Sequence, residues 1–203
     1  MASIPRELNT ADVAFAPPHP GKRFSEEEFA AWCGEDARAE WVDGEVIVMS
    51  PASWIHARLT RFLTSLLGDF VDAKKLGEVV GVEFSVRLNA KRRLPDVLFV
   101  ANARLGNLRP KHLEGPPNLI IEVVSDDSVD RDWRTKYYEY EAAGVDEYWI
   151  VDPLYQRLEA YRLGDDKTYH AIAPVEGKVA SLVVAGFYLR TEWLWRQPLP
   201  SVP

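Results

Sequence analysis

The chain has 203 residues, a formal net charge of −7 at pH 7 and a sequence pI of about 5.2. Apolar residues make up 47% and charged residues 27%, which is globular composition and excludes a wholly disordered chain. The acidic balance argues against a nucleic-acid coat protein, whose affinity comes from neutralised phosphates. It does not exclude a nuclease, because a catalytic metal needs local acids and a few basic clusters can guide a polyanion.

The apolar runs and the cysteine content predict a cytoplasmic protein. The first residues show no basic segment followed by an apolar one, so we expect no secretory signal. No apolar run approaches the ~20 residues that a membrane span requires, so we expect no membrane partner. Cys33 is the only cysteine, which excludes an intramolecular disulfide and a thiolate zinc cage.

The N-terminal third predicts an arm, a short helix, a hairpin and a long helix. Residues 1–22 contain scattered prolines without periodicity, as expected of an extended arm. Ser25, with a glutamate three residues later, predicts a helix that starts with a capping box. The Asp43-Gly44 pair lies between two short apolar segments and predicts a β-hairpin. From Ser53, apolar residues recur at helical spacing and predict an amphipathic helix.

The central part predicts strands and one more helix. Alternation over residues 82–88 predicts a strand with one buried face. Residues 97–100 and 119–124 do not alternate, which indicates strands buried on both faces, with a loop between them. Aromatic residues at helical spacing then predict a helix that ends at Gly144 in a left-handed cap.

The last part predicts a further buried strand at 148–151, a hairpin of 158–163 with 169–173, and a strand at 179–189. This order predicts an α/β fold with a mixed β-sheet core flanked by helices. We expect an arm at 1–22, one domain at 23–190 and a C-terminal tail at 191–203.

Glu122 is the most informative residue of the sequence. It interrupts an otherwise apolar strand, where an ionised carboxylate is costly unless it is paired or bound to a metal. Asp96 begins the other buried strand, although aspartate is depleted in strands. Two carboxylates at the same end of neighbouring strands are the hard oxygen ligands that Mg²⁺ (or Mn²⁺) prefers. The alternatives are that Asp96 caps a strand start and that Glu122 pairs with a buried Arg or Lys.

Lys136 is expected to return to the level of Glu122. From Glu122 the strand climbs about four residues, roughly 13 Å at ~3.3 Å each. The following helix descends about eight residues, roughly 12 Å at ~1.5 Å each, if it packs antiparallel on the sheet. An ammonium group there would orient the attacking water or stabilise the pentavalent phosphate. The alternative is an exposed helix lysine paired with Asp132 four residues earlier.

Three segments together resemble the Uma-two family of restriction-endonuclease-like proteins: PDVLFV at 95–100, GPPNLIIEVVS at 115–125, and the stretch 131–153 that ends in GVDEYWIVDP. The similarity begins near Glu40 and runs to about residue 190. It implies the PD-(D/E)XK nuclease fold, with an extra N-terminal hairpin and a C-terminal β-hairpin.

The resemblance also implies roles for individual residues. Asp96 and Glu122 are then the two catalytic acids, and the Val123 carbonyl is an additional metal ligand. Glu40 matches an upstream acid, whose alternative is an exposed strand acid opposite a lysine. The superfamily lysine position holds Val124, and Lys136 matches the helix lysine that supplies the charge in this family.

Several residues are candidates for substrate binding. His56 matches a recurrent family position and would contact a phosphate, although a polar residue is also common where a helix begins. Arg92 and Arg93 precede the Asp96 strand, and Arg131 lies in the third matching segment. With other basic residues they would line a cleft with positive charge.

These residues lead to Mg²⁺-dependent hydrolysis of DNA phosphodiesters by a metal-activated water. The alternatives are an inactive nuclease fold that serves as a binding or oligomerisation module, and a hydrolase of a small phosphoester. DNA is the expected partner. A homodimer is expected because cleavage of a duplex needs two sites.

Overall fold

The computed structural model describes residues 21–33, 38–125 and 131–201. The chain divides into two compact units, residues 1–49 and 50–203. Across the described ranges, no helix combines the length and the apolar character needed to cross a bilayer. The expected arm at 1–22 falls almost entirely outside the described residues.

The first unit contains helix α2 (Glu26–Trp32) and the hairpin of β1 (Ala39–Val42) and β2 (Glu45–Val48). The predicted capping box is present, because the Ser25 hydroxyl accepts from the Glu28 N–H and the Glu28 carboxylate accepts from the Ser25 N–H. The turn has positive φ at Asp43 and Gly44, as an Asp-Gly hairpin requires. The predicted helix and hairpin are confirmed.

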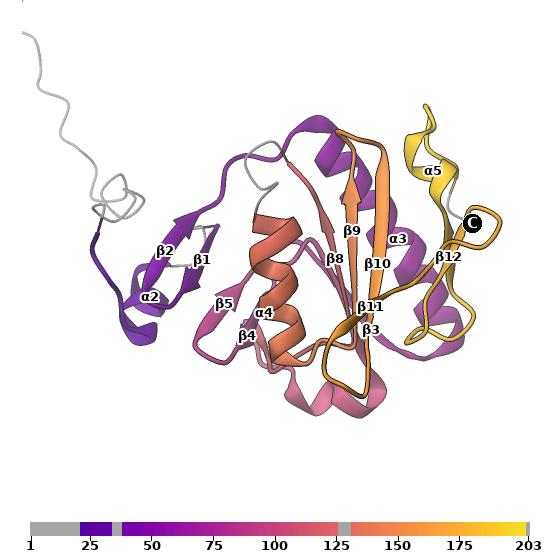
Figure 1. Ribbon diagram of the computed structural model, residues 1–203. Helices are drawn as coiled ribbons and strands as arrows, with labels where there is room; N and C mark the ends of the chain where they lie inside the picture. The colour runs from indigo at the N-terminus through magenta and orange to yellow at the C-terminus, as the bar shows by residue number, and fades with distance from the viewer. Residues whose placement is uncertain (1–20, 34–37, 126–130, 202–203) are drawn as a thin grey trace, which may run out of the picture. The chain divides into compact units, whose positions relative to one another are not determined.

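The second unit is built on a six-stranded sheet in the order β11-β10-β9-β8-β6-β3 (Figure 1). Its strands are β3 (Gly77–Gly81), β6 (Val97–Ala101), β8 (Leu119–Val123), β9 (Glu147–Asp152), β10 (Arg157–Leu163) and β11 (Tyr169–Ala171). Strands β8 and β9 are parallel and the other neighbours are antiparallel, so the sheet is mixed, as predicted.

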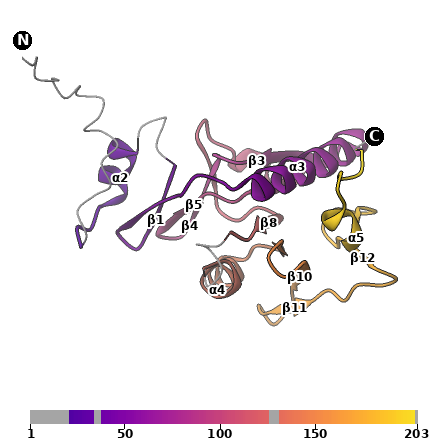
Figure 2. The same ribbon diagram turned by 90° about the horizontal axis from the view of Figure 1, so that it is seen from above.

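Helices cover both faces of this sheet (Figures 1 and 2). Helix α3 (Trp54–Lys74) packs on the face that carries Val97 and Ile121. Helix α4 (Lys136–Ala143) packs on the other face, which carries Leu98 and Ile120. Because both faces are covered, the central strands are apolar without alternation.

Strands β4 (Ser85–Leu88), β5 (Lys91–Arg93) and β7 (His112–Glu114) lie beside the main sheet, and β4 pairs with each of the other two. The strand predicted from residue 82 is wrong at its start. Residues 82 and 83 form a turn, and Glu83 has a φ of +78°, which breaks the extended backbone. The loop expected between residues 100 and 119 contains the short helix η1 (Asn102–Asn107) as well as β7.

The C-terminal strand predicted over 179–189 is also wrong. It is two short antiparallel strands, β12 (Lys178–Ala180) and β13 (Tyr188–Arg190), followed by helix α5 (Thr191–Trp195). Gly186 has a φ of +86° and Phe187 donates to the Val184 carbonyl, so the chain turns between the strands. Alternation alone does not reveal this reversal.

The helix predicted before Gly144 is confirmed at its end. Gly144 has a φ of +82°, and its N–H reaches the carbonyls of Glu141 and Tyr140. A π-helical turn, η2 (Arg131–Thr135), runs directly into α4. The predicted beginning near residue 128 lies outside the described residues.

Buried Glu147 ties the C-terminal segment to the sheet. Its Oε1 accepts from Trp149 Nε1 at 2.6 Å, and its Oε2 accepts from the N–H groups of Leu182 and Val183 at 2.8 and 3.1 Å. Burial raises the pKa of Glu147, although these donors act in the opposite direction.

We expect Glu147→Gln to lower the free energy of unfolding by about 1–3 kcal/mol, because the new amide N–H₂ faces donors. Thermal denaturation should then show a fall of about 2–4 °C per kcal/mol. Glu176→Gln, at an exposed position, serves as the control. An unchanged melting temperature for the Glu147 variant would mean that this carboxylate does not anchor the segment.

Candidate metal centre

Asp96 and Glu122 lie at the same end of two neighbouring strands. Asp96 directly precedes β6 and Glu122 lies on β8, and these strands pair antiparallel with Val97 opposite Ile121. The Asp96 carboxylate accepts from the backbone N–H of Val123, the residue after Glu122. Both side chains are buried, at 8% and 2% exposed. The fold therefore brings the two predicted acids together at one edge of the sheet.

Asp96 is held by one donor from β8 and one from α3. Its Oδ2 accepts from the Val123 N–H at 2.8 Å and lies 3.1 Å from His56 Nε2. Because an ionised carboxylate only accepts, His56 Nε2 carries the proton of this hydrogen bond. His56 is fixed in the first turn of α3, where its N–H donates to the Ser53 hydroxyl at the helix N-cap. His56 thus contacts a predicted metal ligand.

Glu122 is held by two donors from α4. Its Oε1 lies 2.9 Å from Lys136 Nζ and accepts from the Tyr140 hydroxyl at 2.8 Å. Lys136 Nζ also lies 3.1 Å from Asp132 Oδ1. All four side chains are almost completely buried. The helix does return Lys136 to Glu122, and its pairing with Asp132 occurs as well, although the lysine is buried rather than exposed.

The protein groups around Glu122 disfavour its charged form. The pKa of Glu122 is raised to about 8, because burial and the charges of Asp96 and Asp132 outweigh the lowering by the Lys136 ammonium. A cation between Asp96 and Glu122 would relieve both the desolvation and the repulsion.

The backbone of Val123 adds a third oxygen at the same place. The Val123 N–H points toward Asp96, whereas the Val124 N–H donates to the Val151 carbonyl of β9. The N–H and C=O of one strand residue point to the same side of the strand. The Val123 carbonyl therefore points toward the side of β8 on which Asp96 lies.

The donor set fits a hard divalent cation that keeps part of its water shell. It consists of two carboxylates and a backbone carbonyl, and Mg²⁺ is commonly bound by one or two carboxylates with several waters. Within residues 21–33, 38–125 and 131–201, no three His, Cys, Asp or Glu side chains are grouped as a metal-binding cluster. Such a site would thus depend on water or substrate oxygens for its remaining ligands.

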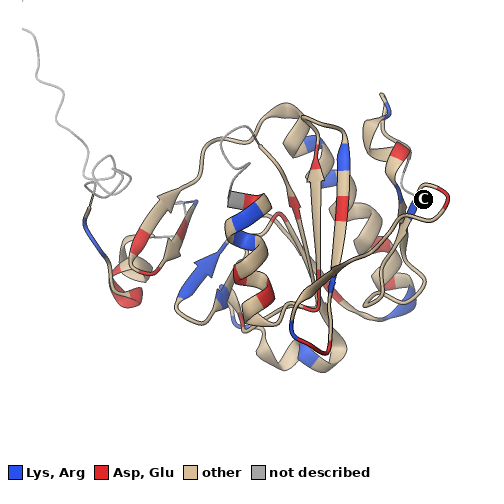
Figure 3. Cartoon of the chain, viewed as in Figure 1, with Lys and Arg blue, Asp and Glu red and all other residues tan. Residues whose placement is uncertain are grey.

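The basic residues before Asp96 have different environments. Strand β5 is coloured as a basic segment in Figure 3. Arg93, however, is only 1% exposed, and its Nε and Nη2 donate to Glu139 Oε2 at 2.8 and 2.6 Å. Arg92 is half-buried. Arg93 therefore joins β5 to α4 as a structural ion pair.

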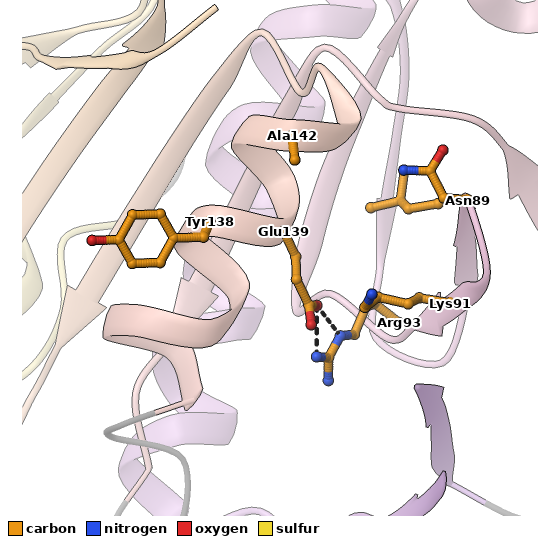
Figure 4. A pocket seen from close by; sticks show the side chains of 7 residues that line it. Asn89, Lys91, Arg93, Tyr138, Glu139 and Ala142 are labelled. Carbon is orange, nitrogen blue, oxygen red and sulfur yellow. Dashed lines mark hydrogen bonds and ion pairs between the residues drawn. The ribbon is translucent and has the colours of Figure 1, made fainter. Parts of the chain in front are cut away.

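A pocket of about 190 Å³ lies over this ion pair (Figure 4). It is lined by Leu88, Asn89, Lys91, Arg93, Tyr138, Glu139 and Ala142. The Tyr138 ring points away from the ion pair (Figure 4). Glu139 follows Lys136 by three residues, so the pocket lies about one helical turn along α4 from the acid pair.

Two further candidates are described apart from the acid pair. Arg131 begins η2, but its side chain lies outside the described part of the structure. Glu40 lies on β1 in the first unit, where it is buried and opposite Ile47 of β2. The alternative interpretation is therefore wrong in expecting an exposed acid, because Glu40 is fully buried.

The sequence interpretation missed three partners of the candidate site. They are His56 as a neighbour of Asp96, Tyr140 as a donor to Glu122, and Asp132 as a buried acid. Asp132, Lys136 and Tyr140 follow one another at intervals of four residues. This spacing puts the three side chains on one stripe of the helix that faces the core. An acid, a lysine and a tyrosine on such a stripe were the signal in the sequence for a buried polar cluster.

The mixed sheet with helices on both faces is an α/β fold that a solved structure shares. A crystal structure described as a putative nuclease belonging to DUF820, from Anabaena variabilis ATCC 29413, superposes with a TM-score of 0.71. It is 15% identical, over 85% of this chain and 97% of that chain, so the similarity shows a shared fold. Residues 26–192 match the family described as "Uma2: Putative restriction endonuclease", and the chain belongs to this family. Among curated proteins, none matches.

Proposed function

We propose that the protein is a Mg²⁺-dependent endonuclease that hydrolyses DNA phosphodiesters by attack of water. The observation that carries the proposal is the buried Glu122 carboxylate, which contacts Lys136 and lies next to Val123, the residue whose N–H binds Asp96. Family membership supports a nuclease-like function, and divalent metals are general in restriction-endonuclease-like proteins.

Each side chain then has a defined task. Asp96, Glu122 and the Val123 carbonyl would hold the ion. When bound, a divalent cation makes water more acidic and neutralises charge on the phosphate. The Lys136 ammonium, held between two acids, would orient the attacking water and stabilise the negative charge that develops on the phosphoryl oxygens.

Isothermal titration with Mn²⁺ tests this proposal directly. We expect one binding site in the wild type and no binding heat for Asp96→Ala or for Glu122→Ala, because each change removes a carboxylate ligand. Cleavage of supercoiled and linear DNA, measured in the same buffers, should be lost in both variants. Absence of metal binding and cleavage in the folded wild type would reject the proposal.

A second candidate is an inactive member that uses the same fold as a binding or oligomerisation module. The favouring observation is that Lys136 already partners Glu122, so the buried acid has a counter-charge without a metal. A wild type that binds no Mn²⁺ but still binds DNA or self-associates would support this candidate.

We further predict that the protein is a cytoplasmic homodimer and that its nuclease domain has boundaries near residues 22 and 190. Sedimentation equilibrium with and without DNA measures the oligomeric state. A monomer at every concentration, with full cleavage of both strands, would contradict the dimer.

A further inference from the structure

We infer that Tyr140 and His56 are positioning residues. Each binds one oxygen of a carboxylate, Glu122 or Asp96, and thereby orients the other oxygen of that carboxylate toward a divalent cation. The inference rests on the proposed metal site and adds two residues to it. It follows from a common pattern at the two acids, in which a helix donor and a second donor bind one and the same carboxylate oxygen.

The pattern is the same at both carboxylates. At Glu122, both the Lys136 ammonium and the Tyr140 hydroxyl bind Oε1. At Asp96, both the Val123 N–H and the His56 ring bind Oδ2. Neither Glu122 Oε2 nor Asp96 Oδ1 accepts a hydrogen bond from the described residues. One oxygen of each acid is therefore held by the protein and the other is left for a further ligand.

Tyr140 is suited to this task by its place on α4. It follows Lys136 by four residues, so both side chains leave the same face of the helix. Its ring is fully buried in the core and packs edge-on against Tyr148, with 5.1 Å between ring centroids. A buried hydroxyl needs a partner, and this one binds the oxygen that Lys136 also binds. Two donors on one oxygen fix the rotation of the carboxylate, which one donor would leave free.

His56 performs the corresponding task from the other face of the sheet. Asp96 precedes β6, and its carboxylate, rather than a backbone carbonyl, accepts the Val123 N–H. The imidazole of His56 holds the same oxygen from the first turn of α3. Because groups that orient metal ligands affect metal affinity, loss of this hydrogen bond should weaken binding of a cation.

The first test compares Tyr140→Phe with Tyr169→Phe. Tyr169 is a neighbouring buried tyrosine whose hydroxyl donates to the Val145 carbonyl, so its removal matches the size and burial of the change. We expect Tyr140→Phe to raise the Mn²⁺ dissociation constant by about 10–100-fold and to lower kcat, with KM for DNA unchanged. The control should keep the wild-type dissociation constant. Equal affinities for the wild type and Tyr140→Phe would overturn the role of Tyr140.

The second test uses rescue at position 56. His56→Ala removes the donor, whereas the amide of His56→Gln can replace Nε2 as a donor to Asp96. We expect His56→Ala to weaken Mn²⁺ binding by about 10–100-fold and His56→Gln to recover most of that loss. If Ala leaves the affinity unchanged, or Gln is as weak as Ala, the hydrogen bond has no positioning role. A wild type that binds no Mn²⁺ rejects the proposed function itself, whereas binding that is insensitive to both residues rejects only this inference.

Discussion

Lys136→Met is expected to lower the rate of DNA cleavage by about 10²–10³-fold at saturating metal, the usual loss when one donor to a developing oxyanion is removed. Methionine keeps most of the length of the side chain and removes its charge. The change also leaves Glu122 and Asp132 without their shared cation, and breaking a buried pair costs about 3–5 kcal/mol. Circular dichroism in the assay buffer must therefore establish that the variant is folded when its rate is measured.

The position of the lysine can be tested by moving it. In the superfamily pattern the lysine stands two residues after the glutamate, where this chain has Val124. Residues 122 and 124 face the same side of the sheet, because side chains alternate along a strand. Val124 is 1% exposed and belongs to the same core cluster as Tyr140, on the α4 face. A lysine at 124 would therefore reach the neighbourhood of Glu122 when position 136 holds methionine.

We expect the double variant Val124→Lys/Lys136→Met to recover roughly tenfold or more of the cleavage rate lost in Lys136→Met, because it restores a cation. Val124→Met/Lys136→Met is the matched control and should recover nothing. A Lys136→Met variant that cleaves DNA at the wild-type rate would show that the ammonium group takes no part in the reaction.

Much of this site was visible in the sequence because it violates local patterns. Glu122 interrupts a strand that is otherwise apolar, and burial on both faces makes that interruption costly. The rise per residue in a strand and in a helix was enough to predict that Lys136 returns to Glu122, and the 2.9 Å contact agrees with that geometry. Strong periodicity also predicted α3, whose N-cap in the structure is Ser53.

The rest depends on contacts between distant segments. His56 and Asp96 are 40 residues apart, and no local pattern specifies that the start of α3 meets the start of β6. Strand β3 was missed because its sequence, GEVVG, has only two apolar residues and a glycine at each end. The first residue of β3 must be glycine for a reason that also lies in a distant segment. A Cβ on Gly77 would lie 2.1 Å from the Val100 carbonyl oxygen.

Glu122→Gln is expected to make the metal-free protein more stable than the wild type at alkaline pH. The folded-state pKa of Glu122 is raised from 4.5 to about 8, so folding favours its protonated form. Its stabilising contribution is complete below pH 4.5 and is lost as the pH rises toward 8. Glutamine offers Lys136 and Tyr140 the same type of acceptor and does not titrate.

The difference in unfolding free energy between Glu122→Gln and the wild type should therefore grow between pH 4.5 and about 8, by at most about 1.4 kcal/mol per pH unit, and stay constant above that range. Urea denaturation without metal at pH 5, 7 and 9 measures it. Glu176→Gln, an exposed substitution, should show no such trend. A difference that does not change with pH would contradict the raised pKa of Glu122.

Added Mn²⁺ should narrow this difference in stability at pH 7.5. Only the wild type keeps both carboxylates, so at a Mn²⁺ concentration of 100 times the dissociation constant it should gain about 2.7 kcal/mol, and Glu122→Gln should gain nothing. A residue that lowers the free energy of unfolding without a metal, and raises it when a metal is bound, serves function rather than folding. If Mn²⁺ stabilises neither protein, Glu122 is a buried acid partnered by Lys136 and not a metal ligand.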